Sequence, residues 1–171
     1  MRRLAGSKAK THGERFESLI ERTCRSYSKE GAAEIKKTPE PLRVVQPLGK
    51  RQFRAVFIKK AQPDFQGTLT GGRSVVFEAK HTQTTNLPFD RVNPEQARDL
   101  NTHHKMGALC FILVSFKFEH FYAIEWQEWL NLANNSGKKS FNQKDVQRFK
   151  IEPKGLKLPF LDVLRDLEKE K

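Results

Sequence analysis

The sequence predicts a mixed α/β fold in which helices flank a central mixed β-sheet. Three observations support this class. A helical apolar pattern covers residues 13–29, strand-like apolar runs with turn signals between them follow up to residue 82, and a capped helix separates these from two further apolar strands at residues 108–125. A chain of 171 residues is long enough for one domain with a substantial core, and short for two.

The chain begins with a basic segment that leads into the first helix. Residues 1–12 are small, polar and basic, and we expect a disordered tail there, ahead of a single domain at residues 13–171. Gly31 ends the first helical pattern, whose apolar members are Phe16, Leu19, Ile20, Cys24 and Tyr27. Prolines around the sequence LRVVQP then predict an extended segment and a turn before residue 50.

Strands follow. Residues 52–61 form a strand-like run, and residues 62–80 predict two strands joined by a turn at a Gly-Gly pair. This hairpin brings Asp64 toward the strand that carries Glu78.

The second half of the chain predicts a capped helix, two strands and two closing helices. Asn93 and Pro94 form an N-cap and first-turn pair, and Gly107 ends that helix. The later elements, in order, are strands at residues 108–116 and 120–125, a short helix at residues 126–133 and a final helix opened by Pro159.

The composition favours a polyanionic partner. The net charge is +12, and residues 1–60 alone hold 16 Lys and Arg against 6 Asp and Glu, a net charge of +10. The two cysteines imply no disulfide framework. No apolar stretch approaches the length of a bilayer span, and the N-terminus lacks the apolar segment of a secretory signal, so we expect a soluble cytoplasmic protein. A basic targeting helix is the alternative, but the N-terminus has few apolar residues for it.

The stretch SVVFEAKHTQ carries charges in a strand that is otherwise apolar. Glu78 and Lys80 are two residues apart, so both project from the same side of the strand. The pattern Glu-x-Lys is weak alone, because it also occurs at Glu34 and Glu152. Only the copy at Glu78 lies on a strand, after a hairpin with its own acidic residue, Asp64.

Two carboxylates held close together resist burial unless a positive group lies between them. A hard divalent cation such as Mg²⁺ suits this position, because it binds carboxylate, carbonyl and water oxygens and commonly bridges to phosphate. A bound metal lowers the pKa of its water and neutralises charge on a phosphoryl transition state, and a neighbouring lysine can orient the water or stabilise that charge. Asp64, Glu78 and Lys80 together therefore predict a phosphodiester hydrolase.

The spacing of Pro63-Asp64 and Glu78-Ala79-Lys80 resembles the PD-(D/E)XK nuclease superfamily. Longer blocks resemble the RecU family of Holliday-junction resolvases, in the same order and over roughly residues 13–160. They are GERFESLIE, KRQFRAVFIKKAQPDFQGTLTGGRSVVFEAKHT, LPFDRVNPEQARDLNTHHKMGALCFILVSF and GKKSF. The resemblance implies a restriction-endonuclease-like core, a homodimer, and symmetric cleavage of a four-way DNA junction with Mg²⁺, for which Mn²⁺ can substitute.

The resemblance also implies roles for residues at matching positions. Asp64 and Glu78 would be metal ligands, with the main-chain carbonyl of Ala79 as a third. Lys80 would be the catalytic lysine.

Two further matches are on helices, and one position departs from the family. Gln96 resembles a glutamine that lines the active site, and Glu17 resembles an acidic residue that supports the metal or its waters. The family usually has small hydroxyl residues just before the aspartate, whereas this chain has Gln62 and Pro63. A hydroxyl contact to metal-bound water or phosphate is therefore expected to be absent or replaced.

Basic residues interleaved with apolar ones predict phosphate contacts. The family resemblance implies a protruding stalk at residues 44–62, and this segment is basic. The expected DNA-binding residues are Lys50, Arg51, Arg54, Lys59 and Lys60 in this segment, Arg2 and Arg3 in the tail, and Lys138 and Lys139 in a later loop.

Other interpretations of these patterns stay open. Asp64, Glu78 and Lys80 could form a surface hairpin with an exposed salt bridge, and the basic strand could be an edge strand protected by charge. The functional alternatives are a related nuclease that cuts flaps or duplex DNA, and a non-catalytic nucleic-acid-binding module.

Overall fold

The computed structural model describes residues 2–39, 41–57 and 62–170. The helices are α1 (Arg2–Lys29), α2 (Pro94–Lys105), α3 (Trp126–Asn135) and α4 (Phe160–Lys169), with short 3₁₀ turns η1 (Phe89–Arg91) and η2 (Gln147–Phe149). The strands are β1 (Ala33–Lys37), β2 (Leu42–Gly49), β3 (Gln52–Phe57), β4 (Phe65–Leu69), β5 (Ser74–Thr82), β6 (Asn86–Pro88), β7 (Leu109–Phe116), β8 (His120–Glu125), β9 (Ser140–Asn142) and β10 (Lys150–Ile151).

The main sheet is mixed, as the sequence predicts. Its strand order is β1-β4-β5-β7-β8-β10. β5 and β7 run parallel, with Val75 opposite Leu109, and the other neighbouring strands are antiparallel. Every residue of β7 is buried, which explains why this strand is apolar in the sequence except for Ser115.

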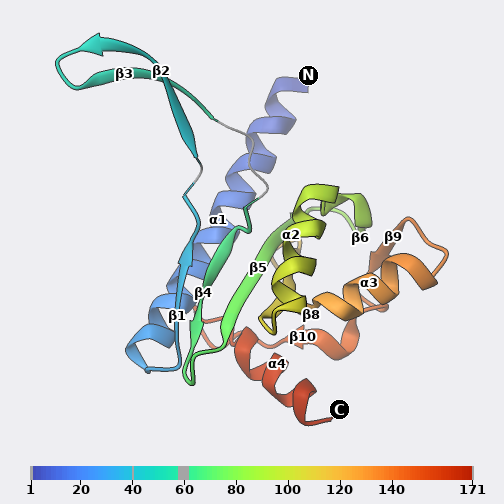
Figure 1. The fold of residues 1–171 in the computed structure, drawn as a ribbon. Helices are drawn as coiled ribbons and strands as arrows, with labels where there is room; N and C mark the ends of the chain where they lie inside the picture. Colours follow the sequence, from blue (N-terminus) through green and yellow to red (C-terminus); the bar gives the residue numbers. More distant parts are fainter. Residues whose placement is uncertain (1, 40, 58–61, 171) are drawn as a thin grey trace.

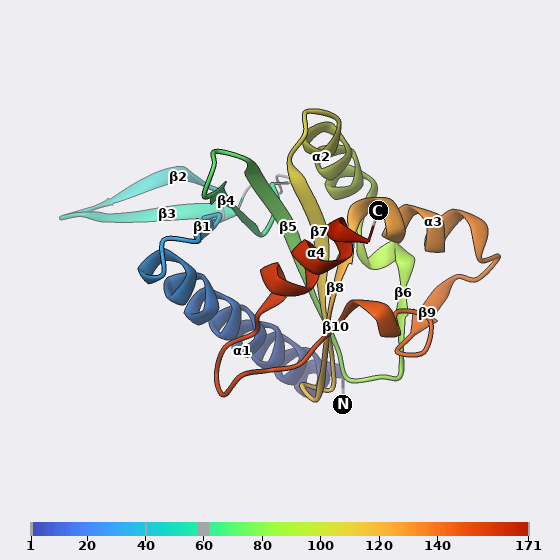
Figure 2. The same cartoon turned by 90° about the horizontal axis from the view of Figure 1, so that it is seen from below.

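Helices cover both faces of the main sheet (Figures 1 and 2). On one face, α1 and α4 pack against Phe77 and the other residues of β5 whose side chains point to that face. On the other face, α2 and α3 pack with Val76 and Ile112. Because β5 alternates between these two cores, the side chains of Glu78 and Lys80 belong to the face that α2 covers.

A separate hairpin of β2 and β3 projects away from the body of the protein (Figure 1). Six of its apolar side chains are 41% to 60% exposed, so they add little to the core; they are Leu42, Val44, Val45, Leu48, Phe53 and Val56. The hairpin overlaps the segment at residues 44–62 where a basic stalk is expected, and residues 58–61 lie outside the part of the chain that the structure describes.

The N-terminal segment differs from its prediction. The sequence predicts a disordered tail at residues 1–12, whereas α1 begins at Arg2 and runs without a break to Lys29. The physical reason is that Arg, Lys, Ala and Leu are good helix formers, and adding turns to an existing helix is far easier than nucleating a new one.

The sequence reasoning also missed β1, the edge strand beside β4. Its residues alternate between buried and exposed, but the strand is short and mostly charged. Gly67 of β4 is required for this pairing, because a Cβ atom there would lie 2.0 Å from the main-chain oxygen of Glu34. Long-range pairing thus decides the strand where local pattern is weak.

Among the described residues, no helix is long and apolar enough to cross a membrane.

Candidate active site

Asp64 and Glu78 are neighbours because of the register of one hairpin. In the antiparallel pair β4 and β5, Phe65 lies opposite Phe77. The residue before β4 therefore matches the residue after Phe77 on β5, so Asp64 falls opposite Glu78 although the two are fourteen positions apart in the sequence. The turn at Gly71 and the following glycine has positive φ angles of 93° and 90°, which fix this register without strain.

Glu78 is fully buried, and in the described part of the chain only one of its two carboxylate oxygens accepts hydrogen bonds. Its Oε2 atom accepts a hydrogen bond from Lys80 Nζ at 2.7 Å and another from Gln96 Nε2 at 2.6 Å. Its Oε1 atom is buried and has no hydrogen-bond partner among the described residues. A buried carboxylate oxygen without a donor is costly, so this atom is available to a ligand from outside the protein's own polar groups.

Burial raises the pKa of Glu78 to about 8. The neighbouring ammonium of Lys80 lowers this pKa and the carboxylate of Asp64 raises it, but loss of solvent is the largest effect. The protein therefore holds a carboxyl group whose ionised form is only partly compensated by Lys80 and Gln96. A cation placed at its free oxygen would supply that compensation.

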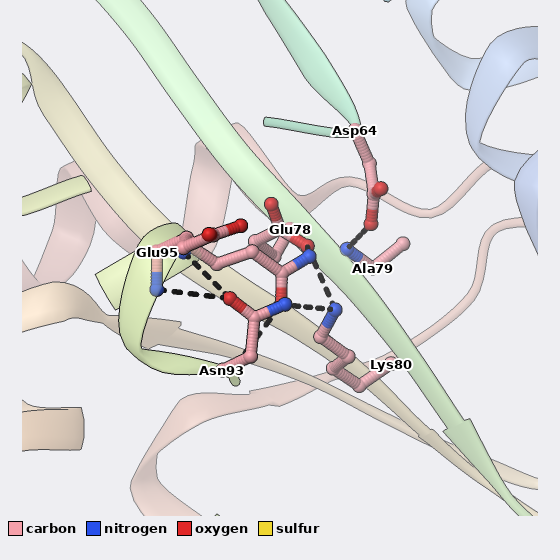
Figure 3. Close-up of polar contacts among 7 residues, drawn as sticks. Asp64, Glu78, Ala79, Lys80, Asn93 and Glu95 are labelled. Atoms are coloured by element: carbon pink, nitrogen blue, oxygen red, sulfur yellow. Dashed lines mark hydrogen bonds and ion pairs between the residues drawn. The ribbon is translucent and has the colours of Figure 1, made fainter. Parts of the chain in front are cut away.

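Asp64 is anchored to the main chain of β5 (Figure 3). Its Oδ2 atom accepts a hydrogen bond from the N–H of Ala79 at 2.9 Å. In a strand, the N–H and C=O of one residue point to the same edge, so the carbonyl of Ala79 is on the Asp64 side. β4 begins at Phe65, which pairs with Phe77. The edge of β5 at Ala79 is therefore not paired with β4.

These groups fit a hard divalent cation. The donors are two carboxylates, of which Glu78 has an unpartnered oxygen, and a main-chain carbonyl on the same edge. Within the described residues, no group of three or more His, Cys, Asp or Glu side chains is placed to hold a metal ion. Mg²⁺ suits a small set of oxygen donors because it retains several of its waters.

Gln96 links the carboxylate site to the first turn of α2. Its side chain completes a capping box with Asn93, because Gln96 Oε1 accepts from Asn93 N at 3.2 Å and Asn93 Oδ1 accepts from Gln96 N at 2.9 Å. The same Oε1 atom accepts from Lys80 Nζ at 3.4 Å, and Nε2 donates to Glu78. The cap therefore fixes the orientation of the amide in the site.

Replacing Asn93 with Ala tests this coupling. The loss of the N-cap oxygen is expected to cost about 1 kcal/mol of stability. Because Gln96 is then oriented less tightly, the rate of the phosphodiester hydrolysis that the sequence predicts should fall roughly 10-fold. Asn93→Ser keeps a capping oxygen and should restore both properties, measured by thermal unfolding and by single-turnover cleavage. Equal cleavage by the Ala variant and the wild type would show that the cap does not act on the site.

Glu17 lies beside the site without touching its carboxylates in any described hydrogen bond. It forms an ion pair of 2.6 Å with Lys37, at the end of β1. Lys37 lies opposite Phe65 and so borders Asp64. Sequence reasoning missed Lys37, and no local signal identifies it because the pairing of β1 with β4 places it. The role of Glu17 in supporting a metal stays a prediction.

The predicted DNA-binding residues fall in three places. Lys50 and Arg51 form the tip of the stalk and Arg54 is on β3, all exposed. Lys138 makes a 2.7 Å ion pair with Asp145, and its neighbour Lys139 precedes β9. The side chains of Arg2 and Arg3, and the whole of Lys59 and Lys60, lie outside what the structure describes.

The fold and this carboxylate pair define the class. The mixed sheet flanked by helices, with one acidic residue just before β4 and another on β5, has the restriction-endonuclease-like fold. A structure of the same fold is that of Archaeoglobus fulgidus Hjc, a Holliday junction resolvase from an archaeal hyperthermophile. It matches 88% of this chain and 99% of its own with a TM-score of 0.52 and 12% sequence identity.

The chain belongs to the RecU family, described as recombination protein U, whose match covers residues 11–168. The Holliday junction resolvase RecU of Staphylococcus epidermidis is 28% identical over 148 residues, which cover 80% of this chain and 70% of that protein. The protein of the same name from Shouchella clausii is 26% identical over 150 residues, covering 83% and 72%.

Proposed function

We propose that this protein is a Mg²⁺-dependent endonuclease that resolves Holliday junctions in recombination by symmetric phosphodiester hydrolysis. The main support is the pair of carboxylates, of which Glu78 is buried and has one unpartnered oxygen, in a member of the RecU family. Mn²⁺ is expected to substitute, because it also accepts oxygen ligands in octahedral geometry. Because a protein with this function acts on DNA, we expect it in the cytoplasm.

Asp64, Glu78 and the carbonyl of Ala79 would hold the ion, which supplies Lewis acidity and a water of lowered pKa when bound. Lys80 is buried and its Nζ atom is fixed by Glu78 and Gln96. From this position its ammonium can hold a water for attack or neutralise charge on the phosphoryl oxygens. Hydrolysis then forms one bond from water to phosphorus and breaks one phosphodiester bond.

Symmetric cleavage needs two such sites. The described carboxylate site is built from one chain, from β4, β5 and α2. A twofold-symmetric homodimer would present two copies in a fixed relation to a four-way junction, so the dimer geometry rather than base contacts would select the branch. Phosphate contacts from the basic stalk would add affinity that falls with salt.

The stalk tip offers a test of this DNA contact. Lys50 and Arg51 form a two-residue hairpin loop with positive φ angles of 36° and 66°, a conformation that favours Asn-Gly. A Lys or Arg residue in this left-handed backbone conformation costs about 1 kcal/mol of folding stability. We infer that the two charges at the tip are kept because they bind DNA. Lys50→Asn with Arg51→Gly should stabilise the hairpin and weaken junction binding.

The expected readouts are slower amide hydrogen exchange in β2 and β3 and a salt dependence of junction affinity that is shallower by about two phosphate contacts. Stabilisation without any change in the salt dependence would mean that the tip does not contact DNA.

The substrate is tested by incubating the protein with an immobile four-way junction, a flap and a matched duplex, each with Mg²⁺ or with EDTA. Paired, symmetric nicks in the junction that require Mg²⁺ are the expected result. Cleavage of the flap or duplex at a comparable rate would instead assign a nuclease of broader action. Binding without cleavage would assign a nucleic-acid-binding module.

A further inference from the structure

A second cationic site lies on the α1 side of the sheet. A groove of about 520 Å³ opens between the C-terminal part of α1 and the turn before α4. Its charged lining consists of Arg22, Arg25, Lys29, Lys154 and Lys157. We propose that this groove binds the phosphate backbone of a duplex arm, away from the site of cleavage. This proposal rests on the proposed function in one respect only, namely that the bound DNA is branched.

The helical part of the groove has the spacing of a backbone-binding surface. Arg22, Arg25 and Lys29 are three, four and seven residues apart, so they share one face of α1. At 1.5 Å per residue, Arg22 and Lys29 are separated by about 10 Å along the helix. A DNA strand places a phosphate about every 3.4 Å along its axis, so this row can span about three phosphates.

The charges in this row are uncompensated. In the described part of the chain, Arg22, Arg25 and Lys29 form no ion pair within 4.0 Å. Both lysines across the groove are paired, Lys157 with Glu30 at 2.6 Å and Lys154 with Asp162 at 3.7 Å. Like charges three or four residues apart destabilise a helix. The helix dipole favours a cation only in the last turn, which accounts for Lys29 but not for Arg22 or Arg25. An anionic ligand accounts for all three.

The opposite wall of the groove is held rigidly against α1. The N–H of Leu158 donates to Thr23 Oγ1 at 2.9 Å, and the N–H of Leu161 donates to Tyr27 Oη at 3.1 Å, both in buried positions. Residues 154–157 close a tight turn through two main-chain hydrogen bonds of 2.9 and 3.1 Å. The lysines on this turn are therefore presented by a fixed backbone, which lowers the entropy lost on binding.

The location of the groove sets the expected dependence on DNA length. The C-terminal end of α1 lies at the opposite end of the protein from the tip of the stalk (Figure 1). DNA held by the stalk would have to extend along the body to reach the groove. Long arms should therefore gain affinity from it, and short arms should not.

The double variant R22A/K29A removes two groove cations, and K105A/K144A removes two exposed lysines elsewhere, so both proteins have the same net charge. Affinity is measured by fluorescence anisotropy in Ca²⁺ across a salt series, on junctions with arms of about one helical turn and about three turns. R22A/K29A is expected to weaken long-arm binding about 10-fold and to reduce the salt slope by about two, with short-arm binding and cleavage unchanged. K105A/K144A should match the wild type.

Equal salt slopes for the two double variants on long-arm DNA would overturn the groove assignment, provided that both unfold at the wild-type temperature. Failure of the proposed function gives a different result. If the wild type cuts no junction but R22A/K29A still loses affinity for long duplexes relative to K105A/K144A, the groove stands and the resolvase activity does not.

Discussion

Asp64→Asn is expected to slow junction cleavage by at least about 10³-fold, or roughly 4 kcal/mol in activation free energy, while junction affinity stays within about threefold of the wild type. The amide keeps an oxygen that can accept the hydrogen bond from Ala79 N, which is 2.9 Å from the carboxylate, so the strand geometry should be retained. The lost negative charge is the one that a divalent cation needs. Single-turnover cleavage with Mg²⁺ and anisotropy in Ca²⁺ measure the two effects.

The matched control is Asp166→Asn, the same chemical change at an exposed position of α4. It should leave both cleavage and binding unchanged. Loss of cleavage and binding together in Asp64→Asn, with a lowered unfolding temperature, would show that Asp64 has a structural role instead.

The stability of the metal-free protein is expected to fall as the pH rises from about 4.5 to about 8. The pKa of Glu78 is raised from its ordinary value of 4.5 to about 8 in the folded state, so the folded protein binds more protons than the unfolded protein across this window. Full ionisation of Glu78 would remove as much as about 5 kcal/mol. Urea unfolding in EDTA at several pH values measures this loss, and Mg²⁺ should reverse part of it above pH 8.

Glu78→Gln is the control for this pH dependence, because it removes the titrating group and keeps the shape. Its stability should vary less over the same window and should not respond to Mg²⁺. Burial lowers the pKa of His81, which adds a slope of opposite sign near neutral pH, but both proteins share that contribution. Identical pH profiles for the variant and the wild type would contradict the assignment of the buried ionisation to Glu78.

Several parts of the site follow from local sequence. The period-two alternation of β5 places Glu78 and Lys80 on one face, and the structure joins them at 2.7 Å. The Gly-Gly turn sets the hairpin register that pairs Asp64 with Glu78. The Asn93-Pro94 signal places the start of α2 correctly.

Other parts of the site could not be predicted in this way. Gln96 serves both the helix cap and the carboxylate, and its second contact depends on how closely α2 packs against β5. The pairing of Glu17 with Lys37 depends on a short edge strand that local pattern does not reveal. Lys138 is engaged by Asp145, seven residues away, across the turn around β9.

The sequence by itself determined the order of the main helices and of strands β3, β4, β5, β7 and β8, the sharing of one face by Glu78 and Lys80, and the family. Each of these is carried by periodicity and spacing along consecutive residues. Only the tertiary structure decided that Glu78 is buried with one free oxygen, and that the turn before α4 closes a basic groove against α1. Burial and grooves arise when segments distant in the chain pack together, and the solvent and charges around a group then set its chemistry.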